Sequence, residues 1–133
     1  MKIALIGTGN MGKIVHSLAD EKGYEAVVTI NEDNASVSAQ ELSQQLCNAD
    51  VAIDFSIASA VKGNVKACML AGLPIVEGTT GWTGSRDEIR KIVMDHDGAM
   101  VFGANFSIGV NLFYRLIKFA AELFAKFPEY EVF

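Results

Sequence analysis

Short apolar runs alternate along this chain with segments in which apolar residues recur every three or four positions. Runs bounded by glycine, proline or polar residues predict strands over residues 2–6, 25–30, 50–54, 74–77 and 99–102. The wider spacing predicts helices over residues 11–22, 38–46, 58–71, 86–96 and 109–127. Strands that alternate with helices in this way favour an α/β fold, a doubly wound parallel sheet with helices on both faces.

The residues at the ends of these elements support their boundaries. Ser38 and Glu41 have the spacing of a capping box at the start of a helix. Gly23 and Gly72 follow the last apolar positions of two other helices, where glycine commonly ends a helix.

The helix over residues 109–127 is apolar around most of its circumference. Its large apolar residues are Leu112, Phe113, Leu116, Ile117, Phe119, Leu123 and Phe124. Such a helix must be covered on several sides, and a predicted strand begins at Tyr130, shortly before the chain ends. We therefore expect residues 1–129 to form one domain and residues 130–133 to begin a second, truncated one. The alternative is a small self-contained protein in which this helix dimerises.

Composition and charge narrow the classes of function. The chain has 133 residues, half of them apolar, which suits a single domain with a substantial core. Its net charge of -5 offers no cationic surface to a phosphate backbone, so nucleic acid is not an expected partner. No apolar stretch could span a bilayer and a strand follows Met1 directly, so we expect no membrane partner, no signal peptide and a cytoplasmic location. Cys47 and Cys68 lack a paired spacing and are expected to be reduced thiols that act as small core hydrophobes.

A helix start follows the first strand through a turn whose sequence is Gly7-Thr8-Gly9-Asn10-Met11-Gly12. This order of strand, glycine turn and helix is typical of a Rossmann-type dinucleotide-binding domain. Gly7 permits the tight turn, Gly9 lets the backbone approach a pyrophosphate, and Gly12 lets the helix lie close to the strand. The free N–H groups and the positive dipole end of the helix would then face the phosphates. The alternative is that these glycines serve packing only.

Ligands of such sheets bind beyond the carboxyl ends of the strands, so the loops there are the candidates for cofactor contact. After the second strand, Glu32 can accept hydrogen bonds from the adenosine ribose, with Asn31 as the alternative. Asp33 adds a negative charge where a 2'-phosphate favours arginine, which predicts NADH as the preferred cofactor and NADPH as the alternative. Lys13 would weaken that preference, and a solvated acidic loop is the other interpretation of Asp33.

The three later loops supply the remaining candidates for cofactor binding. They are Phe55 and Ser56, then Gly78, Thr79 and Thr80, and finally Gly103, Ala104, Asn105 and Phe106. Small residues beside a lone amide suit a nicotinamide and a substrate cleft. For Ser56, Asn105 and Ser107 the alternative is helix capping. Trp82 is either a wall of the pocket or, as we favour, packing at a loop corner.

The later loops also carry a family resemblance. Its segments are Val51-Ala52-Ile53-Asp54-Phe55-Ser56, Gly78-Thr79-Thr80-Gly81 and Ala104-Asn105-Phe106-Ser107-Ile108-Gly109-Val110-Asn111. They resemble the 4-hydroxy-tetrahydrodipicolinate reductase (dihydrodipicolinate reductase) family of lysine and diaminopimelate biosynthesis. The resemblance implies a two-domain oxidoreductase in which NADH or NADPH reduces a small dicarboxylate substrate to tetrahydrodipicolinate, with a substrate domain that forms a homotetramer. It also implies that residues 7–12 hold the pyrophosphate, Glu32 the ribose, and residues 78–80 and 103–106 the nicotinamide end.

Two departures from the family pattern bear on function. Asn10 stands where many members have an arginine in a longer glycine loop, which fits the NADH preference. The family's catalytic histidine pair, lysine and carboxylate-binding segment would begin beyond Phe133, so we expect no catalytic residue in this chain. His16 and His96 fall on helices and are interpreted as structural, and no spacing of histidine, cysteine and carboxylate predicts a metal site. We therefore expect a cofactor-binding part that is nearly inactive alone.

Two other functions stay open from the sequence. One is the nucleotide-binding domain of another small-molecule dehydrogenase, and the other is a non-enzymatic module that senses NAD(H). The fold alone does not separate these functions from the reductase, because one fold hosts many activities.

Overall fold

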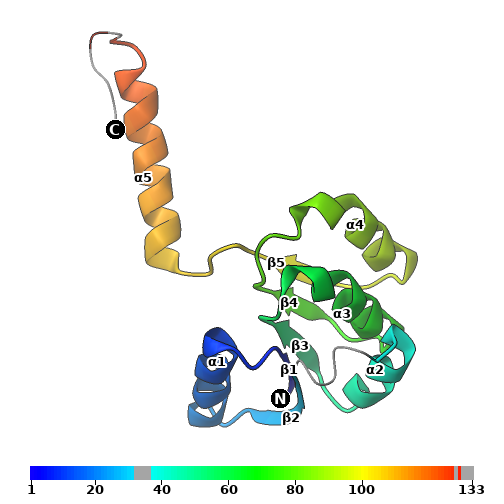
Figure 1. The fold of residues 1–133 in the computed structure, drawn as a ribbon. Coiled ribbons are helices and arrows are strands. Elements are labelled where there is room, and N and C mark those ends of the chain that lie inside the picture. The colour runs from blue at the N-terminus through cyan, green and yellow to red at the C-terminus, as the bar shows by residue number, and fades with distance from the viewer. Residues whose placement is uncertain (32–36, 128, 130–133) are drawn as a thin grey trace.

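The computed structural model describes residues 1–31, 37–127 and 129 of the chain (Figure 1). Its strands are β1 (Lys2–Ile6), β2 (Glu25–Ile30), β3 (Val51–Asp54), β4 (Ile75–Glu77) and β5 (Met100–Phe102). Its helices are α1 (Asn10–Glu21), α2 (Ala39–Leu46), α3 (Ala58–Leu70), α4 (Arg86–Asp95) and α5 (Ile108–Phe124), with a 3-10 turn over Thr83–Ser85. The predicted alternation of strands and helices is confirmed. The 3-10 turn was not predicted, α5 ends before the predicted residue 127, and the predicted strand at Tyr130 lies outside the described residues.

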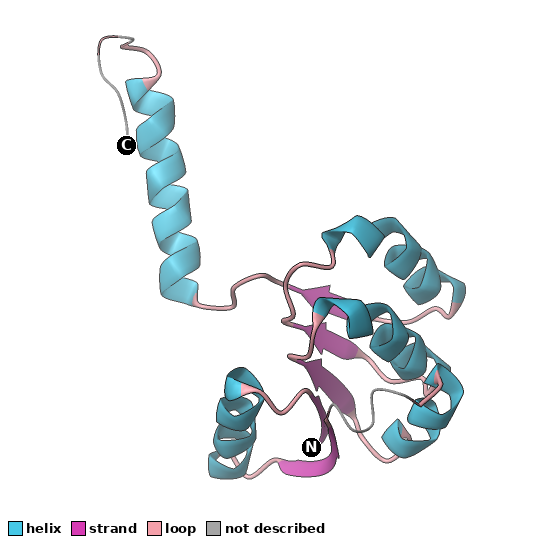
Figure 2. Ribbon diagram, viewed as in Figure 1, coloured by secondary structure: helices cyan, strands magenta, loops and turns pink. Residues whose placement is uncertain are grey.

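All five strands are parallel and lie in the order β2-β1-β3-β4-β5. The predicted doubly wound α/β fold is therefore correct. In the ribbon views α1 lies on one side of the sheet, whereas α2, α3 and α4 lie together on the other (Figures 1 and 2). The chain runs from β1 outward to β2 and then returns to β3 on the opposite side of β1. Strand order thus reverses between β1 and β3, which is where parallel sheets of this kind bind ligands.

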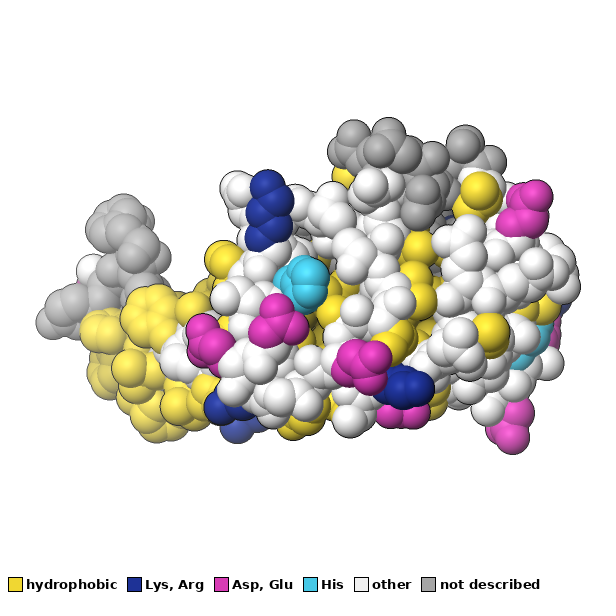
Figure 3. Space-filling model, turned by 90° about the horizontal axis from the view of Figure 1, so that it is seen from below, with side chains coloured by type: hydrophobic (Ala, Val, Ile, Leu, Met, Phe, Trp, Pro, Cys, Tyr) yellow, Lys and Arg dark blue, Asp and Glu magenta, His cyan; other side chains and the backbone are white. Residues whose placement is uncertain are grey.

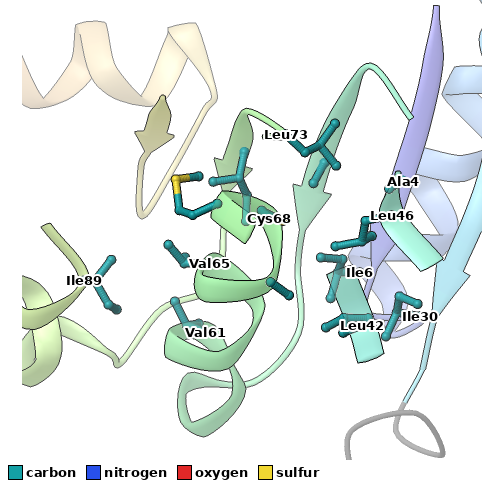
Figure 4. Close-up of a cluster of buried hydrophobic side chains, with 14 of the residues drawn as sticks. Ala4, Ile6, Ile30, Leu42, Leu46, Val61, Val65, Cys68, Leu73 and Ile89 are labelled. Carbon is teal, nitrogen blue, oxygen red and sulfur yellow. The ribbon is translucent and has the colours of Figure 1, made fainter. Parts of the chain in front are cut away.

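Burial on both faces explains why β1 is apolar from Ile3 to Ile6. Ile3 and Leu5 pack with Ala19 of α1 in one cluster. Ala4 and Ile6 point the other way, into the larger core beneath α2 and α3 (Figure 4). Alternate residues of a strand face opposite sides of the sheet. In a strand that is covered on both sides, successive residues are therefore all buried and apolar.

The larger core lies between the sheet and the layer formed by α2, α3 and α4. Its fully buried side chains include Leu46, Val61, Val65, Cys68, Ile75 and Ile89, several of which are drawn in Figure 4. Each large apolar side chain buried in this way contributes about 1.5–3 kcal/mol to folding. The expectation that both cysteines are core residues holds for Cys68 and is wrong for Cys47. Cys47 is the exposed C-cap residue of α2, where its thiol donates to the Gln44 carbonyl oxygen at 3.0 Å.

Helix α5 extends away from the sheet, and its described residues include none that is buried (Figures 1 and 2). Leu112, Phe113, Leu116 and Phe119 are each more than half exposed. Hydrophobic side chains gather over this end of the molecule in the space-filling view (Figure 3). Within the part of the chain that the structure describes, no helix combines the length and apolar character that a membrane crossing needs.

Candidate functional site

A ladder of backbone hydrogen bonds joins the loops at the carboxyl ends of neighbouring strands. The amide of Gly7 donates to the last residue of β2, and the amide of Phe55 donates to the last residue of β1, both at 2.8 Å. Gly78 donates in the same way to Asp54 of β3 at 2.8 Å, and Gly103 donates to Glu77 of β4 at 3.1 Å. The loops that follow β1, β3, β4 and β5 therefore start from one connected edge of the sheet.

A cleft opens at this edge, at the point where strand order reverses. Its lining residues are Ile6, Gly7, Thr8, Gly9, Ile30, Asn31, Val37, Ala39, Leu42, Phe55, Ser56, Ile57, Ala60, Gly63 and Asn64. The structure thus brings together predicted site residues from the loops after β1 and β3, and Asn31 after β2. Glu32 and Asp33 lie outside the described residues. The predicted residues after β4 and β5 belong to the same edge of the sheet but do not line this cleft.

The glycine turn after β1 combines two packing glycines with one open glycine. Gly7 has a φ of +93°, and a Cβ there would overlap the carbonyl group of Phe55. A Cβ at the buried Gly12 would overlap the carbonyl oxygen of Gly7. A Cβ at Gly9 would have no atom within 4 Å, so this backbone is open toward the cleft that it lines. The packing interpretation thus accounts for Gly7 and Gly12, whereas Gly9 leaves room for the close approach of a ligand.

Helix α1 begins at this turn with an N-terminus that suits an anion. Gly9 is its N-cap residue and supplies no side-chain hydrogen bond, and its first turn holds no acidic residue. Asn10 and Met11 lie in that first turn and are exposed. Unsatisfied N–H groups and the positive end of the helix dipole favour a phosphate group at this position.

Asp54 organises the loop that follows β3. It is fully buried, and its carboxylate accepts hydrogen bonds from the Ser56 amide and the Asn64 side chain, each at 2.8 Å. The Asn64 amide group also donates to the Ser56 hydroxyl at 3.1 Å. Ile57, without a side-chain hydrogen bond, is the N-cap residue of α3. The alternative that Ser56 caps this helix is therefore wrong.

Glu77 plays the equivalent part in the loop that follows β4. This fully buried side chain accepts a hydrogen bond from the Thr79 amide at 2.7 Å through Oε1. The Thr79 carbonyl oxygen in turn accepts a bond from the indole N–H of Trp82 at 2.7 Å. Trp82 is buried and meets the Phe102 ring edge to face, with 5.3 Å between ring centroids. The favoured interpretation of Trp82 as packing at a loop corner is confirmed.

Asp54 and Glu77 are register partners on adjacent strands. Burial and, after it, the nearby charge of Asp54 together raise the pKa of Glu77 to about 8, against the opposing hydrogen bonds from Thr79. Cys68 on α3 shares this environment, because burial followed by the two carboxyl charges raises the pKa of its thiol to about 12. Sequence reasoning missed this pair. The only signal was an acidic residue at the end of each of two apolar strands.

The loop after β5 is organised by its own side chains. The Asn105 side-chain oxygen accepts from the Ser107 amide at 2.8 Å, and the Ser107 hydroxyl caps α5 by accepting from the Val110 amide at 3.3 Å. Asn111 donates to the carbonyl oxygens of Asn105 and Ser107. The Phe106 ring lies against Gly103, where an added Cβ would stand 3.3 Å from the ring. The capping alternative is thus correct for Ser107, whereas Asn105 closes the turn before the cap.

Both histidines lie away from the cleft. His16 sits on the exposed surface of α1 with its Nε2 3.9 Å from an Asp20 carboxylate oxygen. The Nδ1 of His96 lies 2.8 Å from the Ile92 carbonyl oxygen at the end of α4. Neither ring lines the cleft, and among the residues described no group of three or more His, Cys, Asp or Glu side chains is placed to hold a metal ion.

Comparison with known families gives the chain's relationship. Residues 1–106 match the family described as "Dihydrodipicolinate reductase, N-terminus". The chain belongs to the dihydrodipicolinate reductase family. The match spans the glycine turn and all the loops described above up to Phe106, so the family resemblance inferred from the loop motifs is confirmed.

Curated members of the dihydrodipicolinate reductase family align with nearly the whole chain. The 4-hydroxy-tetrahydrodipicolinate reductase of Christiangramia forsetii is 33% identical over 134 residues, which cover 99% of this chain and 53% of that protein. The enzyme of the same name from Zymomonas mobilis is 35% identical over 91% of this chain and 48% of its own length. The one from Acinetobacter baumannii is 31% identical over 98% of this chain. The chain spans about half the length of the curated relatives it matches.

Proposed function

We propose that this chain binds a nicotinamide dinucleotide and is the cofactor-binding part of a 4-hydroxy-tetrahydrodipicolinate reductase. The observation that carries the proposal is the open backbone at Gly9, at the start of an uncapped helix and beside the cleft where strand order reverses. Gly7, Thr8, Gly9, Asn10, Met11 and Gly12 would form the cradle of the pyrophosphate. Membership of the family supports this assignment.

The remaining sequence-predicted residues complete the proposed cofactor site. Glu32 would accept hydrogen bonds from the ribose, and Phe55 and Ser56 would flank the dinucleotide where they line the cleft. The loop residues Gly78, Thr79, Thr80, Gly103, Ala104, Asn105 and Phe106 would surround the nicotinamide end. NADH is the proposed preference and NADPH the alternative, because Asp33 would add a negative charge where a 2'-phosphate favours arginine.

A bound nicotinamide cofactor supplies hydride, and the protein supplies position and charge. In the proposed reaction, a small dicarboxylate substrate is reduced to tetrahydrodipicolinate in lysine and diaminopimelate biosynthesis. The described residues that line the cleft include no histidine, lysine or arginine. A group that neutralises the substrate nitrogen and cationic groups that bind two carboxylates are therefore missing from the cleft. We propose that the chain alone binds cofactor and is nearly inactive.

Assembly and location belong to the same proposal. The cofactor domain would comprise residues 1–129, with α5 as its last helix, and a substrate domain would begin at residues 130–133. The full-length protein would be a cytoplasmic homotetramer.

Calorimetric titration of the chain with NADH and with NADPH tests the proposed function. We expect saturable binding of both with tighter binding of NADH, and the Gly9→Ala variant should lose affinity for both. Tighter binding of NADPH would contradict the role given to Asp33. A folded chain without affinity for either dinucleotide would overturn the proposal, and rapid oxidation of NADH by the chain with substrate would overturn its inactivity.

A further inference from the structure

Two buried carboxyl groups stand side by side beneath the loops that we assign to the cofactor. Asp54 and Glu77 end the adjacent strands β3 and β4, are paired in register, and have no exposed surface. Their side chains lie on the α3 side of the sheet, because Asn64 of α3 donates to Asp54. Two acidic side chains in such a position must either ionise together in a buried space or share a proton.

Each of the two carboxyl groups holds one loop by a backbone amide two residues farther along. Asp54 accepts from the Ser56 amide at 2.8 Å, and Glu77 accepts from the Thr79 amide at 2.7 Å. The two loops also touch, since the Phe55 ring occupies the space that a side chain at residue 78 would need. A displacement of either carboxyl group therefore moves both segments of the proposed cofactor site.

The hydrogen-bond inventory of the pair favours a proton on Glu77. Its Oε2 and the hydroxyl of Thr79 are both buried without a hydrogen-bond partner among the described residues, so in this geometry a negative charge on Oε2 has no hydrogen bond to compensate it. A protonated Oε2 can instead donate to the neighbouring Asp54 carboxylate, which already accepts from Ser56 and Asn64. The raised pKa of Glu77 agrees with this arrangement.

We propose that Asp54 and Glu77 are positioning residues that hold the loops 55–56 and 78–80 in their cofactor-binding conformation only while Glu77 carries a proton. The proposal rests on the proposed function, because it assigns these loops to the cofactor. Loss of the proton places two like charges on adjacent strand ends. The Thr79 amide donates more strongly to a carboxylate than to a carboxylic acid, but burial and the repulsion from Asp54 outweigh that gain, because the pKa of Glu77 is raised in spite of the Thr79 hydrogen bonds. The repulsion separates the two strand ends and the loops that they hold, and the second negative charge also disfavours an anionic dinucleotide.

Among the groups that surround Glu77, none other is expected to change its charge in the mildly alkaline range. Asp54 faces it from β3, and Cys68 faces it from α3 with a thiol whose pKa is raised to about 12. Asn64 of α3 is uncharged, and β5 pairs Glu77 with Phe102. No lysine, arginine or histidine among the described residues contributes to the pKa of Glu77.

The test measures NADH affinity from about pH 6.5 to 9.5 for the chain and three variants. For the wild type we expect affinity to fall about threefold or more through a midpoint near pH 8, the effect of a binding-linked pKa change of about half a unit. Glu77→Gln, which keeps an acceptor for Thr79 and a donor for Asp54, should lose this transition. Asp54→Asn removes the neighbouring charge and should move the transition to lower pH. Glu88→Gln, which removes an exposed carboxylate paired with Lys62, is the control and should keep the wild-type profile.

A second readout does not depend on the cofactor. The amide NMR signals of Ser56 and Thr79 should shift with the same midpoint in the free chain, and these shifts should be absent in Glu77→Gln. Identical affinity profiles for wild type and Glu77→Gln, or amide signals that stay fixed across the range, would overturn the positioning role. Absence of NADH binding at every pH would overturn the proposed function instead, and the amide shifts would then report separately whether the pair sets the two loops.

Discussion

The carbonyl oxygen of Gly7 occupies the space in which residue 12 would carry a Cβ atom. Gly7 follows the last residue of β1 and has a φ of +93°, and Gly12 lies in the first turn of α1 and is buried. The close approach of these two residues fixes where the first turn of α1 stands relative to β1. The open backbone of Gly9 lies between them, so the two packing glycines determine where the candidate phosphate site faces.

Gly12→Ala should therefore destabilise the fold. The added methyl group must displace either the Gly7 carbonyl group or α1, and such overpacking costs about 1–3 kcal/mol. The free energy of unfolding, measured by urea denaturation, gives the result directly. An unchanged free energy of unfolding would mean that the turn relaxes without cost.

Gly9→Ala should lower NADH affinity and leave the free energy of unfolding nearly unchanged. A methyl group here meets no atom within 4 Å, so stability should stay within about 0.5 kcal/mol of the wild type. NADH affinity should fall roughly tenfold or more, since a blocked backbone approach removes a hydrogen bond to a charged group worth about 1.5–3 kcal/mol. Gly84→Ala, also in open space but within the 3-10 turn, is the control and should change neither quantity. Wild-type NADH affinity in Gly9→Ala would remove Gly9 from the site.

The contact between Phe55 and Gly78 couples the loops after β3 and β4. A methyl group at residue 78 would overlap the Phe55 ring, so Gly78→Ala should destabilise the chain by about 1–3 kcal/mol. In a Phe55→Ala background the same substitution should cost less, with a coupling energy of about 1 kcal/mol in a double-mutant cycle. Additive effects within about 0.3 kcal/mol would show that the two loops move independently.

Features set by neighbouring residues could be predicted from the sequence. The capping box at Ser38 and Glu41 forms as expected because both hydrogen bonds join residues three positions apart. The apolar run of β1 likewise predicts a strand that is buried on both faces, and its residues do pack into the two clusters on opposite sides of the sheet.

Features set by the register between distant segments could not be predicted. Asp54 and Glu77 are neighbours because β3 and β4 pair in this register, and the sequence shows only a single acidic residue at each position. The Phe55 ring over Gly78 depends on the same pairing. From the sequence, Ser56 could cap the helix that follows it, because it lies just before that helix. In the structure Ile57 is the N-cap residue, and the Ser56 hydroxyl instead accepts a hydrogen bond from Asn64 of α3.

Ser38→Ala tests the local part of this encoding. Loss of the hydroxyl that accepts from the Glu41 amide should lower the free energy of unfolding by about 1 kcal/mol. Ser85→Ala is the matched control, because Ser85 is the N-cap residue of α4 but makes no side-chain cap hydrogen bond. That substitution should change stability by less than about 0.5 kcal/mol. Equal effects of both substitutions would show that the Ser38 cap contributes nothing specific.

Glu77→Gln should change how stability depends on pH. The pKa of Glu77 is about 8 in the fold and near 4.5 in an unfolded chain, so between these values the folded state holds a proton that the unfolded state has released. The contribution of Glu77 to stability is therefore fully present below about pH 4.5 and is lost as the pH rises toward 8. Glutamine does not titrate, so the melting temperature of Glu77→Gln minus that of the wild type should increase steadily from pH 5 to pH 8. Glu88→Gln is the control: the Lys62 partner lowers the pKa of exposed Glu88, so its difference from the wild type should stay constant over this range. A constant difference for Glu77→Gln as well would mean that Glu77 is already ionised at pH 5 in the folded chain.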